Sequence, residues 1–116
     1  MSISNRVRKA LRARSSGSTI LGLCEICGHG GTNAHHRRNR SQGGRDVLSN
    51  LILVCGSGTT LCHGAITENP NWAESRGYTI KGTQAVSSET RVFLPLHGGW
   101  VLLDDDGGWS EASDAA

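Results

Sequence analysis

The sequence predicts a small α+β domain that is braced by metal, with a basic helix at the N-terminus and a β-hairpin at the C-terminus. First, the chain of 116 residues fits one domain but holds only 24 Leu, Ile, Val and Phe residues, so burial alone gives marginal stability. Second, its four cysteines offer a staple, either a structural metal or disulfides. Third, the centre of the chain reads as strand, loop, strand and helix.

Residues 1–19 are predicted to form a basic amphipathic helix followed by a linker. Apolar side chains recur there at every fourth position, at Ile3, Val7 and Leu11. Ser2 or Ser4 can serve as the N-cap, because a serine hydroxyl accepts a hydrogen bond from a free N–H of the first turn. The SSGS stretch at 15–18 then reads as a loop.

Residues 20–77 are predicted to form the core of the domain and to carry its chemistry. The AHHR stretch at 34–37 reads as a strand, because it follows a Gly-rich turn and contains no helix cap. SQGGRD at 41–46 is expected to be an irregular loop, since paired glycines disfavour regular structure. LILVC at 51–55 is a continuous apolar run and is expected to be a buried strand that pairs with the first.

Two helices are predicted to complete this core. The first is expected over 60–68, with Thr59 or Thr60 as its N-cap. Asn69 precedes a proline, and a residue in that position avoids helical backbone angles, so the first helix should end there. Asn69 is then expected to cap a second helix that begins at Pro70 and closes at the next glycine.

Residues 78–110 are predicted to form a C-terminal β extension, and residues 111–116 a frayed tail. The β-type runs TRVFLPL and GWVLL are expected to form a hairpin, and DDDGG at 104–108 is the clearest turn signal. A hairpin turn explains these aspartates better than a carboxylate metal site does. His97 stands alone in a β segment and is expected to be structural.

The cysteines are expected to hold a structural zinc ion. The four ligands are Cys24, Cys27, Cys55 and Cys62. The first pair has the Cys-x-x-Cys spacing of half a zinc site, and the wider second pair spans a Gly-rich loop. Reduced buried thiols or disulfides are alternatives, and His29 or His63 can replace one cysteine. A redox function of the first pair is a weaker alternative, because no thioredoxin-like pattern surrounds it.

Positive charge is concentrated in the first part of the chain. Residues 1–48 hold nine Lys or Arg against two acidic residues, whereas residues 49–116 hold three against eight. This asymmetry favours a polyanionic partner, although two solvated surfaces of opposite sign are an alternative. The five aromatic residues are too scattered to form a stacking platform for single-stranded nucleic acid. No signal peptide and no membrane span is recognisable, so a cytoplasmic location is expected.

The central motifs closely resemble the zinc-braced branch of the HNH endonuclease family. The family pattern is a ligand and a His on a short strand, a loop ending in Asn-Leu, an apolar strand, and Cys-His at the start of a helix. In this chain the matching residues are His35-His36, Asn50-Leu51, LILVC and Cys62-His63. The resemblance covers about residues 20–77 and implies a ββα-metal, or His-Me finger, core. The ending GWVLLDDDG is more weakly similar to small phage-encoded members.

The resemblance implies hydrolysis of phosphodiester bonds to give 5′-phosphate and 3′-hydroxyl ends. His36 would act as the general base, and His35 and His63 would bind a catalytic divalent ion. Consecutive side chains of a strand point to opposite sides, which suits neighbouring histidines to two different tasks. Mg²⁺ or Mn²⁺ is the expected ion, and other divalent ions should be tolerated because imidazole also suits Ni²⁺ and Zn²⁺.

Asn50 is expected to tie the Gly-Gly loop to the strand and to hold His36 in orientation, since an amide both donates and accepts. The alternatives are an ordinary loop asparagine, or Asn39 in its place. Four arginines are expected to contact DNA phosphates, namely Arg37, Arg38, Arg40 and Arg45. The N-terminal helix is expected to add a second contact through Arg6, Arg8, Lys9, Arg12 and Arg14.

Together these features predict a metal-dependent DNA endonuclease that nicks or cuts duplex DNA and needs no organic cofactor. The phage resemblance suggests a phage-encoded protein that acts in the host cytoplasm, in DNA packaging beside the terminase. The alternative is a non-catalytic, zinc-bound nucleic-acid-binding module with a vestigial histidine pair. The presence of base, ligands and asparagine together favours the enzyme.

Overall fold

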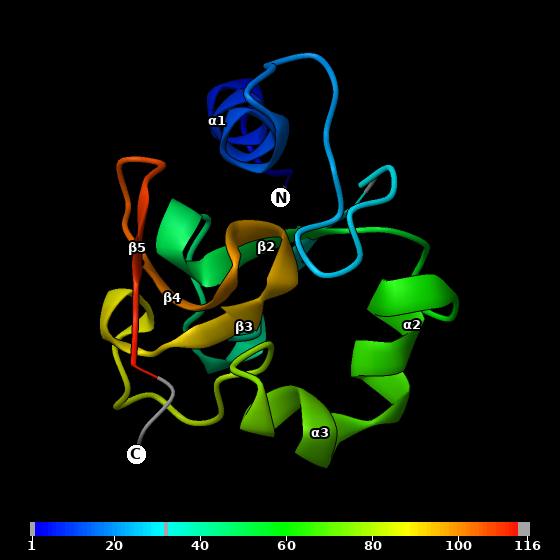
Figure 1. Cartoon of the computed structure of the whole chain (residues 1–116). Coiled ribbons are helices and arrows are strands. Elements are labelled where there is room, and N and C mark those ends of the chain that lie inside the picture. The colour runs from blue at the N-terminus through cyan, green and yellow to red at the C-terminus, as the bar shows by residue number, and fades with distance from the viewer. Residues whose placement is uncertain (1, 32, 114–116) are drawn as a thin grey trace.

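The computed structural model describes residues 2–31 and 33–113, and it is a small α+β structure with two antiparallel sheets (Figure 1). The helices are α1 (Asn5–Ser16), α2 (Leu61–Glu68) and α3 (Pro70–Ser75). The first sheet pairs β1 (Asn33–His36) with β2 (Leu51–Val54). The second contains β3 (Val92–Leu94), β4 (Gly99–Leu103) and β5 (Trp109–Glu111). The predicted α+β class is confirmed at this level.

Helix α1 forms where the apolar periodicity predicts it, and Ser4 rather than Ser2 is the N-cap. The Ser4 hydroxyl accepts a hydrogen bond of 3.2 Å from the backbone N–H of Val7. Gly17 ends the helix, with its N–H donating to the Ala13 carbonyl over 2.8 Å. Leu11 is buried and belongs to a cluster formed with two residues of β2. The apolar side of α1 therefore covers one face of the first sheet.

The two faces of the β1–β2 sheet pack against different parts of the molecule. All four residues of β2 are buried, in agreement with the continuous apolar run. Leu51 and Leu53 pack with α1, whereas Ile52 and Val54 pack with Ile66 of α2. In Figure 1, α1 and the pair α2–α3 accordingly lie on opposite sides of β2. The polar edge of this sheet, at its β1 strand, carries the histidines.

Helices α2 and α3 begin within a residue of their predicted starts, and Thr60 and Asn69 occupy the predicted N-cap positions, but neither side chain makes a cap hydrogen bond. Thr60 precedes α2, yet its hydroxyl accepts a hydrogen bond of 2.9 Å from the Ser57 N–H in the preceding loop. The Asn69 side chain donates to the Ala65 carbonyl over 2.9 Å and makes no cap bond with α3. Asn69 thus occupies the predicted N-cap position of α3 without a side-chain cap bond. Its amide is a second donor to the Ala65 carbonyl, which also accepts the Asn69 backbone N–H over 3.0 Å.

The C-terminal part is a three-stranded sheet rather than the predicted hairpin. After β3, a turn that ends at Gly98 (φ 96°) reverses the chain so that β3 pairs with β4, as the two β-type runs predict. The DDDGG turn follows, and Asp104 Oδ1 accepts from the N–H groups of Asp106 and Gly108 over 2.9 and 2.8 Å. The chain beyond this turn then pairs with β4 as β5. The hairpin turn predicted at 104–108 implies a strand after it, but the extent of β5 was not predicted because its three residues are all exposed and give no apolar alternation.

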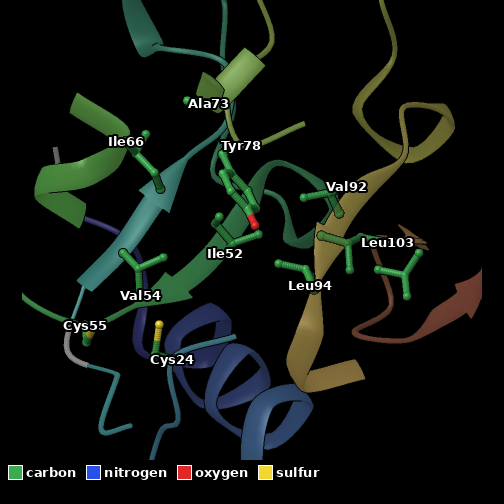
Figure 2. Close-up of a cluster of buried hydrophobic side chains, with 11 residues drawn as sticks. Cys24, Ile52, Val54, Cys55, Ile66, Ala73, Tyr78, Val92, Leu94 and Leu103 are labelled. Atoms are coloured by element: carbon green, nitrogen blue, oxygen red, sulfur yellow. The ribbon is translucent and has the colours of Figure 1, made fainter. Parts of the chain in front are cut away.

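The main core lies between the two sheets and helices α2 and α3. Figure 2 shows the Tyr78 side chain between Ile52 of β2 and Val92 and Leu94 of β3. Its hydroxyl donates a hydrogen bond of 2.6 Å to the Phe93 carbonyl. Tyr78 thus joins the C-terminal sheet to the first sheet and fixes the backbone that follows α3.

A buried ionic cluster joins α1 to the rest of the molecule. Glu25 is fully buried and accepts two hydrogen bonds of 2.9 Å from the Arg14 guanidinium and one of 2.7 Å from His97 Nε2. Burial alone would raise the pKa of Glu25, but the Arg14 charge and these hydrogen bonds leave it below its usual value. Arg14 therefore cannot contact DNA, which corrects its place in the predicted basic surface. His97 is structural, as predicted.

The predicted tail falls partly outside the structure, because residues 114–116 are not among those described. Strand β5 ends at Glu111, one residue inside that predicted tail. Within residues 2–31 and 33–113, no helix has both the length and the apolar character of a membrane span.

Candidate functional site

The four cysteine sulfurs converge at one point beside the first sheet. Cys24 and Cys27 lie in a tight turn, Cys55 follows β2, and Cys62 lies in the first turn of α2. All four Sγ atoms lie within 4.8 Å of one another, and none is in a disulfide. A tetrahedral zinc ion with Zn–S bonds of about 2.3 Å sets its sulfurs about 3.8 Å apart, so the cluster fits such an ion. These cysteines can hold a metal such as zinc, with every ligand supplied by the chain.

The start of α2 has an uncommon backbone conformation. Leu61 has a φ of 54°, the left-handed region that a non-glycine residue enters only at a cost of about 1–3 kcal/mol. Two residues further on, the His63 N–H donates to the Cys55 carbonyl over 3.1 Å. This turn directs Cys62 to the cysteine cluster, while the side chain of the next residue, His63, contacts β1. The strained backbone thus serves two sites through adjacent residues.

His35 of β1 and His63 of α2 lie against each other, as the sequence predicts. Their ring centroids are 5.5 Å apart and the rings meet edge to face. His35 Nε2 lies 2.8 Å from the Tyr78 carbonyl, which can only accept, so Nε2 carries the proton and Nδ1 keeps its lone pair. A hydrogen bond from one ring nitrogen to a backbone carbonyl is the usual support of a metal-binding histidine. We name these two side chains the histidine pair.

The histidine pair is neutral and contains a polar atom that lacks a partner. Burial lowers the pKa of His35 to about 4 and lowers the pKa of His63 in the same direction. Neutral imidazole is the form that binds metal. His63 Nδ1 is buried without a hydrogen bond, alone in this respect among the side-chain atoms of residues 2–31 and 33–113. Buried polar atoms are normally satisfied, so this nitrogen fits a ligand to a cation.

His36 contacts a different part of the molecule from His35. It pairs with Leu51, whose side chain faces α1, and its Nε2 lies 2.7 Å from Asp46 Oδ1. Asp46 also accepts from the Arg40 guanidinium over 3.1 Å. These hydrogen bonds, with that from His36 the strongest influence, hold the pKa of Asp46 below its usual value. His36 is therefore held by a charged carboxylate.

Asn50 connects the loop between β1 and β2 to the end of β1. Its Oδ1 accepts from the Arg38 N–H over 2.8 Å, and its Nδ2 donates to the Arg38 and Arg45 carbonyls over 3.2 and 3.0 Å. Gly44 lies so close to this backbone that a Cβ atom there would stand 1.8 Å from the Arg38 carbonyl oxygen. These contacts match the bonding expected of Asn50, and its part in catalysis stays a prediction. Asn39, the rival, is exposed.

Arg37 is part of the core, and the prediction that it contacts DNA is wrong. Its residue is only 1% exposed. Its guanidinium donates to backbone carbonyls of three segments, with the 2.8 Å bonds to Ser49 and Gly77 and the 2.7 Å bond to Thr90 the best formed. Burial lowers the pKa of Arg37 to about 9, which still leaves it charged at neutral pH. It fastens the segment after α3 to the end of β1.

The other three arginines differ in how free they are to contact DNA. Arg38 donates to the Gly82 carbonyl over 2.8 Å and also to the Ala85 carbonyl. The Arg40 side chain is 44% exposed while it pairs with Asp46. Arg45 is exposed. Arg40 and Arg45 therefore remain accessible to a phosphate, and Arg38 is engaged with the loop that follows α3.

Two features of this site escaped sequence reasoning. Asp46 is the only acidic residue between positions 26 and 67, and that isolation beside the histidines was the available signal. The Tyr78 carbonyl that bonds His35 left no signal, because backbone acceptors are present at every residue.

In a comparison with known protein families, residues 24–68 match the family model described as HNH endonuclease. This segment contains all four cysteines, the histidine pair, His36 and Asn50. No curated protein and no solved structure matches the chain.

Proposed function

We propose that this protein, whose residues 24–68 match the HNH endonuclease family model, is a metal-dependent DNA endonuclease with a ββα-metal core formed by β1, β2 and α2. The observation that carries the proposal is the histidine pair, in which two neutral imidazoles from β1 and α2 meet and one of them has a buried unpartnered nitrogen. A core histidine without function would be expected to satisfy both ring nitrogens.

In this proposal His35 and His63 would hold a divalent cation, Mg²⁺ or Mn²⁺. When bound, the ion supplies charge neutralisation at the scissile phosphate and at the departing 3′ oxygen. The four cysteines bind a structural zinc ion and clamp the turn before β1 to the first turn of α2.

His36 is proposed as the general base that removes a proton from the attacking water. Histidine is suited to this step because it exchanges protons near neutral pH. Asn50 keeps the loop in place over His36 through its bonds to the Arg38 and Arg45 backbone. The products are 5′-phosphate and 3′-hydroxyl ends, by resemblance to the family.

The proposed DNA surface is smaller than the sequence suggested. It contains the accessible Arg40 and Arg45, together with basic residues of α1, of which Arg6 and Lys9 are exposed and Arg8 and Arg12 are half-buried. Phosphate contacts of this kind position a duplex without reading its sequence, so cutting with little sequence preference is expected. An action beside a packaging terminase, and a phage origin, rest on resemblance alone and stay predictions.

The test is nicking of supercoiled plasmid with Mg²⁺ or Mn²⁺ by the wild type and by His36→Ala, purified in the same way to control for contaminating nuclease. The wild type should convert plasmid to the nicked form, and His36→Ala should be slower by about 10²- to 10⁴-fold, the usual value of a general base. Equal rates, or no cleavage by either protein, would favour the alternative of a zinc-bound DNA-binding module.

A further inference from the structure

A chain of three side chains runs from solvent to the proposed general base. Arg40 donates to both carboxylate oxygens of Asp46 over 3.1 Å, and Asp46 Oδ1 lies 2.7 Å from His36 Nε2. The His36 side chain is 17% exposed and that of Asp46 31%. An exposed ion pair such as Arg40–Asp46 adds little stability. The main effect of this arrangement is that it fixes the orientation of the His36 ring.

We infer that Asp46 is the positioning residue of the general base: it fixes the Nε2–H tautomer of His36 and leaves Nδ1 as the atom that accepts the proton from water. This inference rests on the proposed function for its catalytic consequence, while the tautomer itself can be measured without any cleavage.

The tautomer follows from the chemistry of the carboxylate. A charged carboxylate only accepts hydrogen bonds, so the nitrogen that faces it must carry the proton. In the described part of the chain no hydrogen bond is made by His36 Nδ1, and this atom is not among the buried unpartnered atoms. Nδ1 is therefore open to solvent and unprotonated in the neutral ring. Asp46 thus decides which nitrogen can act as a base.

The position of Asp46 is itself held by the loop. The Asn50 amide bonds the carbonyl of Arg45, the residue directly before Asp46. On the other side of the loop, the Gly44 N–H donates to the Asn39 carbonyl over 2.8 Å. Arg40 then fixes the rotamer of the carboxylate. The Asn50 side chain is therefore connected to His36 by way of Asp46, which gives it a mechanical link to the base.

The experiment compares wild type, Asp46→Ala and a matched control, Asp106→Ala, each as the full zinc-loaded chain labelled with ¹⁵N. Asp106 lines the same cavity of about 300 Å³ as Asp46 and carries the same charge, but its carboxylate makes no hydrogen bond or ion pair to the site within the described residues. Long-range ¹H–¹⁵N spectra, assigned with His36→Ala, report which imidazole nitrogen of neutral His36 bears the proton. Plasmid nicking at saturating Mg²⁺ gives kcat and KM for the same proteins.

The wild type and Asp106→Ala should show the Nε2–H tautomer, and Asp46→Ala should show a mixture of both tautomers. The kcat of Asp46→Ala should fall about 10- to 100-fold with little change in KM, the usual effect of losing a residue that orients a catalytic imidazole. An Nδ1–H tautomer in the wild type, or an unchanged spectrum in Asp46→Ala, overturns the inference even if that variant is inactive. A wild type that shows the Nε2–H tautomer but cuts no DNA overturns the proposed function and leaves the positioning geometry standing.

Discussion

The adjacent residues Cys62 and His63 belong to two different candidate metal sites, one with a complete set of protein ligands and one with an incomplete set. Cys62 joins three other thiols in a cluster whose ligands all come from the chain, whereas His63 lies against the ring of His35 and has a buried ring nitrogen with no hydrogen bond among the described residues. A closed ligand set is typical of structural metals, and an open one of catalytic metals. The contrast repeats at the end of β1, where the side chain of His36 is partly exposed and the next residue, Arg37, is buried. In the proposed function, residues that stabilise the fold and residues that take part in the chemistry are therefore neighbours along the chain.

The largest expected effect is loss of the closed site. Cys27 is exposed, so Cys27→Ser removes a ligand with little change in packing. Structural zinc contributes on the order of 10 kcal/mol of binding free energy to the folded state. We therefore expect Cys27→Ser to lose its zinc and its cooperative thermal unfolding, as measured by metal analysis and circular dichroism. A variant with wild-type zinc content and melting temperature would refute the closed site.

Arg37→Met should be the next most damaging change. It removes the guanidinium that satisfies carbonyls of Ser49, Gly77 and Thr90 and leaves those buried acceptors unpaired. We expect a loss of about 3–5 kcal/mol in the free energy of unfolding, because each buried acceptor that is left without a partner costs about 1–3 kcal/mol. Denaturant titration measures it, and Arg45→Met, at an exposed position, is the control. Similar losses in both variants would contradict the assignment of Arg37 to the core.

The buried histidine should also make stability depend on pH. The pKa of His35 is about 4 in the folded protein and about 6.5 in an unfolded chain, so protons bind the unfolded state more strongly. Stability from this group is complete above pH 6.5 and is lost as pH falls toward 4, by about 3 kcal/mol in total.

This effect can be isolated with His35→Gln, whose side-chain amide can still donate to the Tyr78 carbonyl but does not titrate. Unfolding free energies of both proteins, measured without added divalent ion between pH 7 and 4, should diverge, with the wild type falling more steeply. Parallel curves would show that His35 is not protected from protons.

The smallest expected effect concerns the DNA surface. Each lost phosphate contact lowers the slope of log K against log salt by about 0.9. Arg45→Gln should therefore reduce the slope of duplex binding by about one, while Arg38→Gln, whose side chain is engaged with Gly82 and Ala85, should change it less. Fluorescence anisotropy at several salt concentrations measures both slopes. Equal reductions would mean that Arg38 leaves its loop to bind DNA.

The features that sequence reasoning found are those with local signals. The buried run at 51–55 predicts β2, the periodicity of Ile3, Val7 and Leu11 predicts α1, and the cysteine spacing predicts the cluster. The same reasoning failed for Arg37, because an arginine in a basic stretch looks the same whether it faces solvent or distant carbonyls. The acceptors of Arg37 lie up to 54 residues away in the chain, and no local pattern records their convergence.

The contrast between a closed and an open site is tested most directly by counting metal ions in the wild type and in His63→Ala. The account predicts one tightly held zinc ion per chain in both proteins. Calorimetric titration should then detect one added Mn²⁺ in the wild type, and in His63→Ala binding at least about tenfold weaker, the usual cost of disturbing a metal site. Equal Mn²⁺ binding by both proteins, or loss of the zinc ion in His63→Ala, would contradict it.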